Sequence, residues 1–224
     1  MTSDIENEDK NTLRLIEIFA SIQGETSFTG LPTTFIRLAA CNLRCSWCDT
    51  TYSFDRGTSW LVSDIIARVK ELGPRHICVT GGEPLLQKNV HELMRILCDT
   101  GYILSIETGG SLSTVDIDPR VRIILDVKCP HSEMSEKNYW ANLPRLRSQD
   151  EVKFVIMNRE DYQYAKDICN KYRLYEAVDN VLFSPVFGQL EPRDLVEWVL
   201  EDRLPIRLNL QIHKFIWDPL TKGV

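Results

Sequence analysis

Several features that would place the protein in a membrane, outside the cell or on nucleic acid are missing from its sequence. No apolar run in the 224 residues approaches the roughly 20 that a bilayer-spanning helix needs. The N-terminus, MTSDIENEDKNT, is polar and lacks the apolar stretch of a secretory signal, so we expect residues 1–12 to form a flexible tail. A net charge of −6 argues against a broad basic face for nucleic acid.

Linkers, low-complexity segments and sequence repeats are also missing. We therefore expect residues 13–224 to form a single domain with a sizeable core. The seven cysteines are odd in number and follow no signal peptide, which makes a disulfide scaffold a poor interpretation. The sequence thus favours a cytoplasmic protein with reduced thiols.

Three of the cysteines are clustered. Cys41, Cys45 and Cys48 stand in CNLRCSWC with the spacing C-x3-C-x2-C and no fourth cysteine nearby. Structural zinc normally takes four protein ligands, whereas cysteine thiolates are the usual ligands of a 4Fe–4S cluster. Three cysteines would leave one iron open to an outside ligand, which suggests chemistry at that iron. Three buried thiols, or a zinc site completed by a distant residue, are the alternatives.

Short apolar segments alternate with amphipathic ones along the chain. This pattern predicts βαβ units and a parallel sheet, with ligands bound at the carboxyl ends of the strands. A partial (β/α)6 barrel and an open doubly wound sheet both fit. The expected strands are Thr34–Leu38, His76–Val79, Ile103–Ile106, Ile123–Val127, Val152–Ile156, Val181–Phe183 and Leu208–Gln211, and the expected helices are Ser63–Leu72 with a Ser cap, Asn89–Asp99, Arg159–Tyr172 and Pro192–Asp202. Residues 132–148 show no clear pattern.

A resemblance to the radical S-adenosylmethionine (AdoMet) superfamily rests on two motifs. The first is the C-x3-C-x2-C loop after the first predicted core strand, and the second is Gly81-Gly82-Glu83-Pro84 after the next strand. The resemblance implies a partial (β/α)6 barrel of the radical AdoMet type. It also implies that Gly81, Gly82 and Glu83 bind AdoMet, and glycine allows the close backbone approach that such binding needs.

The flanking sequence narrows the resemblance to one family. SIQGETSFTGLPTTFIRLAACNLRCSWCDTTYSF, together with TGGEPLLQ, ETGG, DVKCP, KFVI and LNLQIHKFIW, is similar to the 7-carboxy-7-deazaguanine synthase family of queuosine biosynthesis. Such an enzyme uses a 4Fe–4S cluster, AdoMet and magnesium. A 5′-deoxyadenosyl radical takes a hydrogen atom from 6-carboxy-5,6,7,8-tetrahydropterin, which contracts its ring and loses ammonia. The link to tRNA modification passes through this small-molecule product.

The resemblance assigns roles to single positions. It implies that Cys41, Cys45 and Cys48 hold the cluster and that Thr50 contacts magnesium, a cation that prefers oxygen ligands. Predicted AdoMet contacts beyond the glycine motif are Asp126, Lys128 and Ser184. Predicted contacts to the pterin substrate are Gln23, Glu25, Arg37, Thr80, Glu107 and His213, with the Arg37 fork facing the substrate carboxylate.

The resemblance also implies partners and leaves two alternatives open. It implies a homodimer and an electron donor such as flavodoxin or ferredoxin, with no nucleic acid or membrane partner. A glycyl-radical-enzyme activase would share the cluster motif, and a non-catalytic metal-binding module would share the cysteines. Two departures from the family pattern stand out: Thr26 replaces the glycine expected after Gly24-Glu25, and the chain continues past Lys214 as FIWDPLTKGV. Because threonine does not readily adopt positive φ, Thr26 predicts a different local loop.

Overall fold

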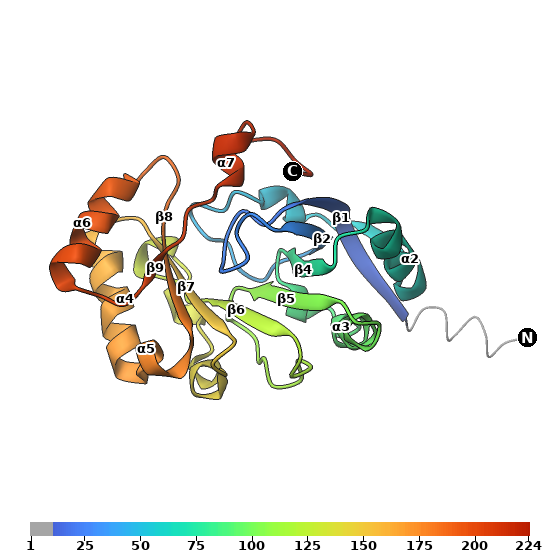
Figure 1. The fold of residues 1–224 in the computed structure, drawn as a ribbon, viewed down its shortest axis with the longest axis horizontal. Coiled ribbons are helices and arrows are strands. Elements are labelled where there is room, and N and C mark those ends of the chain that lie inside the picture. Colours follow the sequence, from blue (N-terminus) through green and yellow to red (C-terminus); the bar gives the residue numbers. More distant parts are fainter. Residues whose placement is uncertain (1–10) are drawn as a thin grey trace, which may run out of the picture.

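One mixed sheet of nine strands organises residues 11–224, the part of the chain that the computed structural model describes (Figure 1). Its order is β3-β1-β2-β4-β5-β6-β7-β8-β9. Neighbours from β2 onward pair in parallel, whereas β1 pairs antiparallel with both β2 and β3. The strands are β1 (Thr12–Ile22), β2 (Pro32–Leu38), β3 (Thr58–Leu61), β4 (His76–Gly81), β5 (Ile103–Thr108), β6 (Arg122–Asp126), β7 (Glu151–Ile156), β8 (Asn180–Pro185) and β9 (Arg207–Leu208). The two edge strands do not pair with each other, so the sheet is an open, partial barrel, as predicted.

The helices lie outside the curved sheet. In Figure 1, α4, α5 and α6 cover one end of the sheet, α2 and α3 cover the other, and α7 lies above it near the C-terminus. The helices are α2 (Val62–Leu72), α3 (Val90–Asp99), α4 (Arg159–Tyr172), α5 (Leu174–Ala177), α6 (Pro192–Asp202) and α7 (His213–Ile216). The four predicted helices are confirmed, but the Ser63 cap is wrong, because α2 begins one residue earlier with Leu61 at its N-cap and no side-chain cap.

Two of the connections between parallel strands contain no α-helix. Residues 109–121 join β5 to β6 without a regular helix. The segment that showed no clear pattern joins β6 to β7 through short 3-10 helices at Pro130–Ser132, Ser135–Lys137 and Trp140–Arg145. The prediction of a (β/α)6 unit therefore holds for the strands better than for the helices between them.

The N-terminal part of the sheet was missed. We expected the first strand at Thr34–Leu38, but β1 precedes it and begins at Thr12, inside the segment expected to be a tail. Leu13 and Leu15 of β1 are fully buried and belong to the core. The rest of the predicted tail, residues 1–10, lies outside the described residues.

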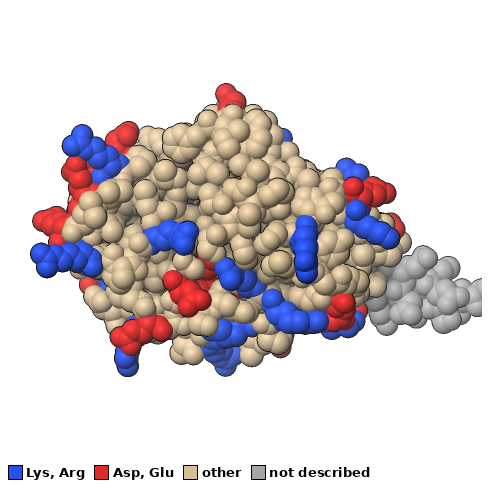
Figure 2. Space-filling view, in the orientation of Figure 1, with Lys and Arg blue, Asp and Glu red and all other residues tan. Residues whose placement is uncertain are grey.

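The C-terminal strand is shorter than expected, since β9 contains only Arg207 and Leu208. The residues after it leave the sheet and pass over the carboxyl ends of the strands toward α7 (Figure 1). Within residues 11–224, no helix combines the length and apolarity needed to cross a membrane. Figure 2 shows both signs of charge mixed on the face in view.

Candidate functional site

A cavity of about 890 Å³ opens at the carboxyl ends of the parallel strands. Its wall includes the cysteine loop after β2, the Gly-Gly turn after β4, the ends of β5, β6 and β8, the loop between β1 and β2, and the C-terminal segment. Small-molecule and cofactor sites span roughly 300–1,000 Å³, so this cavity is large enough for more than one small ligand. The location agrees with the prediction that ligands bind at this edge of the sheet.

The three clustered cysteines all line this cavity. Burial raises the pKa of each thiol, while the positive charge of Lys128 opposes that rise at all three. Cys78, Cys129 and Cys169 are instead buried elsewhere, outside the cavity wall. Across residues 11–224, no three Cys, His, Asp or Glu side chains form a ready-made site for a single metal ion. A thiol trio beside a cation, open to a large cavity, fits the donor chemistry of an iron–sulfur cluster with one open iron.

The two glycines after β4 lie directly against the start of the cysteine loop. A Cβ on Gly82 would stand 2.1 Å from the carbonyl oxygen of Ala40, and one on Gly81 would stand 2.3 Å from that of Leu38. The amide of Gly82 donates to the Leu38 carbonyl at 3.2 Å, and the amide of Glu83 donates to the Ala40 carbonyl at 2.8 Å. Side chains are therefore excluded at both positions, and both glycines also form part of the cavity wall.

Glu83, the third member of this motif, does not line the cavity. Its side chain is fully buried, and its carboxylate accepts from the amides of Leu85 at 3.1 Å and Gly109 at 2.8 Å. The Thr108 hydroxyl lies 2.9 Å from each of its oxygens. These contacts tie the turn after β4 to the end of β5, so the structure gives Glu83 a bracing position beneath the ligand site.

Asp126 at the end of β6, Lys128 just after it and Ser184 near the end of β8, the predicted AdoMet contacts, line the cavity. Lys128 pairs with Asp126 at 2.8 Å, and the other Asp126 oxygen is buried without a partner among the described residues. The Ser184 hydroxyl accepts from the Asn209 side chain at 2.8 Å. A buried carboxylate oxygen without a partner is costly, and a ligand that donates a hydrogen bond there would satisfy it.

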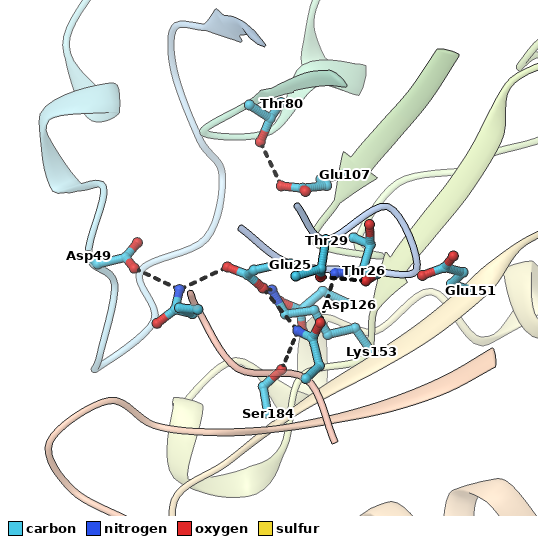
Figure 3. Close-up of polar contacts among 12 residues, drawn as sticks. Glu25, Thr26, Thr29, Asp49, Thr80, Glu107, Asp126, Glu151, Lys153 and Ser184 are labelled. Atoms are coloured by element: carbon cyan, nitrogen blue, oxygen red, sulfur yellow. Dashed lines mark hydrogen bonds and ion pairs between the residues drawn. The ribbon is translucent and has the colours of Figure 1, made fainter. Parts of the chain in front are cut away.

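Three of the predicted pterin contacts form one group in the cavity wall, of which Figure 3 shows Thr80 and Glu107. The Glu107 carboxylate, at the end of β5, accepts from the Thr80 hydroxyl at 3.1 Å and from the Gln23 amide at 3.4 Å. Burial and the negative charge of Glu25 raise the pKa of Glu107. Parallel pairing of β4 with β5 sets Thr80 beside Glu107, and Gln23 reaches them from the loop after β1.

Glu25 is held by residues that the sequence did not single out. Lys153 of β7 forms an ion pair with one Glu25 oxygen, which also receives the Asn209 amide at 3.3 Å, and Gln211 donates to the other oxygen at 2.8 Å. Lys153 stands in KFVI, one of the segments that supported the resemblance. A lysine inside a predicted buried strand is unusual, and that signal could have identified Lys153 as a site residue.

Arg37 lines the cavity, and its Nε pairs with Glu17 of β1 at 2.7 Å. The Tyr52 hydroxyl donates to the same Glu17 oxygen at 2.9 Å. Glu17 therefore fixes the direction of the guanidinium, and within residues 11–224 neither of its Nη nitrogens donates to a protein acceptor. This geometry suits a group prepared to receive an anion.

The C-terminal segment closes the cavity from above. The Ile212 amide donates to the Gly24 carbonyl at 3.0 Å, and a Cβ on Gly24 would stand 2.0 Å from Nδ1 of His213. Burial lowers the pKa of His213. His213 and the last residues, 219–224, belong to the cavity wall, so the extension past Lys214 is part of the site.

The predicted magnesium ligand lies where the cysteine loop meets this segment. The Thr50 hydroxyl donates to Asp49 at 2.9 Å, and the other Asp49 oxygen receives Lys214 at 2.6 Å and Gln211 at 3.2 Å. Burial would raise the pKa of Asp49, but the Lys214 charge and these hydrogen bonds hold it well below its usual range. Thr50 and Asp49 together present hydroxyl and carboxylate oxygens, the donor types that a hard cation prefers.

The loop with the unexpected threonine keeps a left-handed backbone. Thr26 has φ = 68° and is buried. Its amide donates to Asn209 at 2.7 Å and its hydroxyl accepts from the Phe28 amide at 3.2 Å. Threonine thus adopts the positive φ that the sequence analysis considered unfavourable for it, and these contacts offset the strain of about 1–2 kcal/mol.

The comparisons with known proteins agree with this site. The model of the Radical SAM superfamily matches residues 35–198. The chain is 43% identical over 226 residues to the 7-carboxy-7-deazaguanine synthase of Koribacter versatilis, covering 95% of this chain and 100% of that protein. The chain belongs to the 7-carboxy-7-deazaguanine synthase family. The synthase of Chlorobaculum tepidum is 44% identical over 215 residues, with 95% of this chain and 97% of that protein covered.

The fold comparison points the same way. The crystal structure of QueE from Escherichia coli matches with a TM-score of 0.72 at 21% identity, covering 92% of this chain and 97% of that one. SuiB of Streptococcus suis, solved with its precursor peptide SuiA, matches more loosely, with a TM-score of 0.55 at 13% identity over 75% of this chain and 46% of its own. These two likenesses concern the fold, whereas the family model and the curated relatives show that the chain is a radical SAM enzyme of the synthase family. The relatives favour the synthase over the activase and the non-catalytic module.

Proposed function

We propose that this enzyme converts 6-carboxy-5,6,7,8-tetrahydropterin to 7-carboxy-7-deazaguanine with loss of ammonia, in queuosine biosynthesis. One observation carries the proposal. The cavity that receives the three cysteine thiols is also lined by a polar group of Gln23, Glu25, Thr80, Glu107 and His213. A metal-binding module would have no use for that group, and a small heterocycle rich in donors and acceptors would.

The chain's own residues bind and orient the two ligands. The open side of the Asp126–Lys128 pair is suited to AdoMet, because Asp126 keeps one oxygen for a donor. When bound, the cluster and AdoMet supply the one-electron chemistry that removes a hydrogen atom from the pterin. Gln23, Thr80 and Glu107 line the same cavity, where they hold the pterin edge, and Arg37 receives its carboxylate. A site of buried polar groups rejects analogues that leave those groups unpaired.

We propose Thr50 as the magnesium contact, with Asp49 beside it. The support is chemical: the hydroxyl and carboxylate oxygens lie together at the cavity wall. Magnesium keeps several waters and binds through one or two protein oxygens plus ligand oxygens, which fits so small a donor set. Thr50→Val should raise the magnesium concentration needed for half-maximal activity, whereas Thr50→Ser should restore it. Equal magnesium requirements in all three proteins would refute this role.

The decisive experiment is an anaerobic assay. The protein is reconstituted with iron and sulfide, reduced, and supplied with AdoMet, magnesium and 6-carboxytetrahydropterin, and the products are followed by mass. Formation of 7-carboxy-7-deazaguanine is expected, and a protein with Cys45→Ala serves as the control. Formation of 5′-deoxyadenosine without the deazapurine would overturn the substrate assignment and keep the radical chemistry.

We further propose a cytoplasmic homodimer that receives its electron from flavodoxin or ferredoxin. The seven free cysteines support a cytoplasmic location, because their thiols would be oxidised in an oxidising compartment. The homodimer is an expectation from the family resemblance, and light scattering of the purified protein tests it. The electron donor is tested by replacing the chemical reductant with each reduced carrier in turn.

A further inference from the structure

Two carboxylates in the ligand cavity have unlike surroundings. Glu25 forms an ion pair with a buried lysine and accepts from two side-chain amides (Figure 3), whereas Glu107 accepts from a hydroxyl and an amide and forms no ion pair among the described residues. Lys153 reaches Glu25 from the middle of β7, and the side chains of both are about one-eighth exposed, at 13% and 12%. A lysine in the interior of a parallel sheet is unusual, because it is costly to bury unless it is paired.

We propose that Lys153 is a positioning residue of the substrate pocket, which holds the Glu25 carboxylate ionised and in place as a hydrogen-bond acceptor for an N–H group of the pterin edge. This inference rests on the proposed function. It assigns Lys153 no contact with the substrate; Lys153 acts through Glu25.

The acceptor capacity of Glu25 supports this arrangement. An ionised carboxylate offers about four acceptor positions. Lys153 and Asn209 use two on one oxygen, and Gln211 uses one on the other. About one acceptor position remains, and Glu25 lines the cavity. The partners therefore leave Glu25 a single direction in which to accept from a ligand.

Electrostatics agree with the geometry. Burial would raise the pKa of Glu25, but the charge and hydrogen bond of Lys153 lower it below the ordinary value. Glu107 forms no ion pair among the described residues; burial and the Glu25 charge raise its pKa, although the charges of Lys153 and Arg37 oppose that rise. The other titratable groups that act on Glu25 are Asp49 from the cysteine loop and His213 from α7. Lys153 thus gives the two carboxyl groups different roles: Glu25 accepts hydrogen bonds, and Glu107 can keep a proton. A pterin edge, which has both donors and acceptors, requires both roles.

Binding of oxidised 6-carboxypterin tests the inference without turnover. The ligand is titrated by its fluorescence against the reconstituted enzyme with AdoMet present. Lys153→Met should weaken binding by roughly 10- to 100-fold, the usual consequence of removing one partner of a buried charge pair. Lys153→Arg keeps the charge and should retain most of the binding. The matched control is Lys166→Met, which removes a lysine paired with Asp202 at 2.6 Å outside the cavity and should bind as the parent protein does.

A pH series distinguishes the loss of Glu25 positioning from a loss of Lys153 side-chain packing. Without Lys153, the pKa of Glu25 rises, and more of it is protonated at low pH. The loss caused by Lys153→Met should therefore shrink as the pH rises from about 5.5 to about 7.5. A loss that stays constant across this range would overturn the inference, as would binding within about twofold of the parent protein.

A double-mutant cycle gives the remaining test. Because Lys153 acts through Glu25, the double variant Glu25→Gln/Lys153→Met should bind no more weakly than Glu25→Gln alone. Additive losses would mean that Lys153 touches the ligand itself and would overturn the positioning role. The cycle also decides the question if Lys153→Met does not fold, since the double variant contains no unpaired buried charge. Failure of the parent protein to bind 6-carboxypterin would overturn this inference, whereas only failure to form 7-carboxy-7-deazaguanine would refute the proposed function.

Discussion

Replacing Glu83 by glutamine should loosen the junction between β4 and β5 without changing the cavity wall. The carboxylate receives the Leu85 amide on one oxygen and the Gly109 amide on the other. Glutamine has the same shape but only one acceptor oxygen. Whichever way it turns, its NH₂ group faces one of these two backbone N–H groups, donor against donor. The Thr108 hydroxyl can adapt, because it can accept from the NH₂ group.

The magnitude follows from the hydrogen bond that glutamine cannot make. One hydrogen bond to a charged group disappears and one buried N–H is left unpaired, a loss that is partly offset because glutamine avoids burying a charge. Burial does raise the pKa of Glu83, so that offset is real. The net cost is about 2 kcal/mol. At roughly 2–4 °C per kcal/mol for a chain of this size, the melting temperature should fall by about 4–8 °C.

The assay is thermal unfolding of the protein without cluster, followed by circular dichroism, together with AdoMet binding to the reconstituted protein. Glu92→Gln is the matched control: this residue lies on the exposed face of α3 and pairs with Arg95 at 2.7 Å, so its melting temperature should stay within about 2 °C. An unchanged melting temperature combined with lost AdoMet affinity would refute the reasoning. It would mean that Glu83 contacts the cofactor and does not brace the turn.

The site supports three further predictions. Alanine at any one of the three cavity cysteines should abolish bound iron and sulfide, whereas Cys98→Ala should not; an unchanged iron count in Cys45→Ala would contradict the ligand assignment. Gly24→Ala should raise the KM for the pterin more than it lowers the rate of AdoMet cleavage, because the new Cβ displaces the His213 ring; equal KM values would refute the contact. Burial lowers the pKa of His213 below its ordinary value of 6.5, so the contribution of His213 to stability is complete above pH 6.5 and is lost as the pH falls below 6.5. Between about pH 7.5 and pH 5.5, the melting temperature of the parent protein should therefore fall more than that of His213→Gln. Parallel melting-temperature curves for the two proteins would contradict this prediction.

The local patterns predicted the parallel part of the fold well. Strands β4 to β8 and the helices α2, α3, α4 and α6 follow continuous apolar or amphipathic runs, and such runs are decided by nearby residues. The strand β1 was missed although its residues TLRLIEIFASI alternate in character and bury Leu13 and Leu15. Alternating polar and apolar residues are typical of an antiparallel strand near the edge of a sheet. The parallel strands were recognised by a different signal, their continuous buried apolar runs.

The parts of the site that a local motif encodes were predictable from the sequence. The contacts between residues far apart in the chain, which depend on how the sheet curves, were not. The cysteine spacing is contained in eight positions, and all three thiols do reach the cavity. Lys153, by contrast, lies 128 residues from its partner Glu25, and no local pattern marks such a pair. Glu83 is a motif residue next to the site whose carboxylate is turned into the protein, where it accepts from the amides of Leu85 and Gly109, and the local motif does not reveal that direction.

Gln211 shows why the two halves of the site cannot be considered independent. Its single side-chain NH₂ group donates to Glu25 at 2.8 Å and to Asp49 at 3.2 Å, and these carboxylates belong to the pterin side and to the cysteine loop respectively (Figure 3). Two carboxylates that approach the same region repel each other, and a shared donor together with Lys153 and Lys214 offsets that repulsion. Any movement of residues 209–214 would leave both carboxylates short of a partner at once. The C-terminal segment therefore does more than cover the cavity, because it fixes the loop that holds the cysteines relative to the loop that holds the substrate.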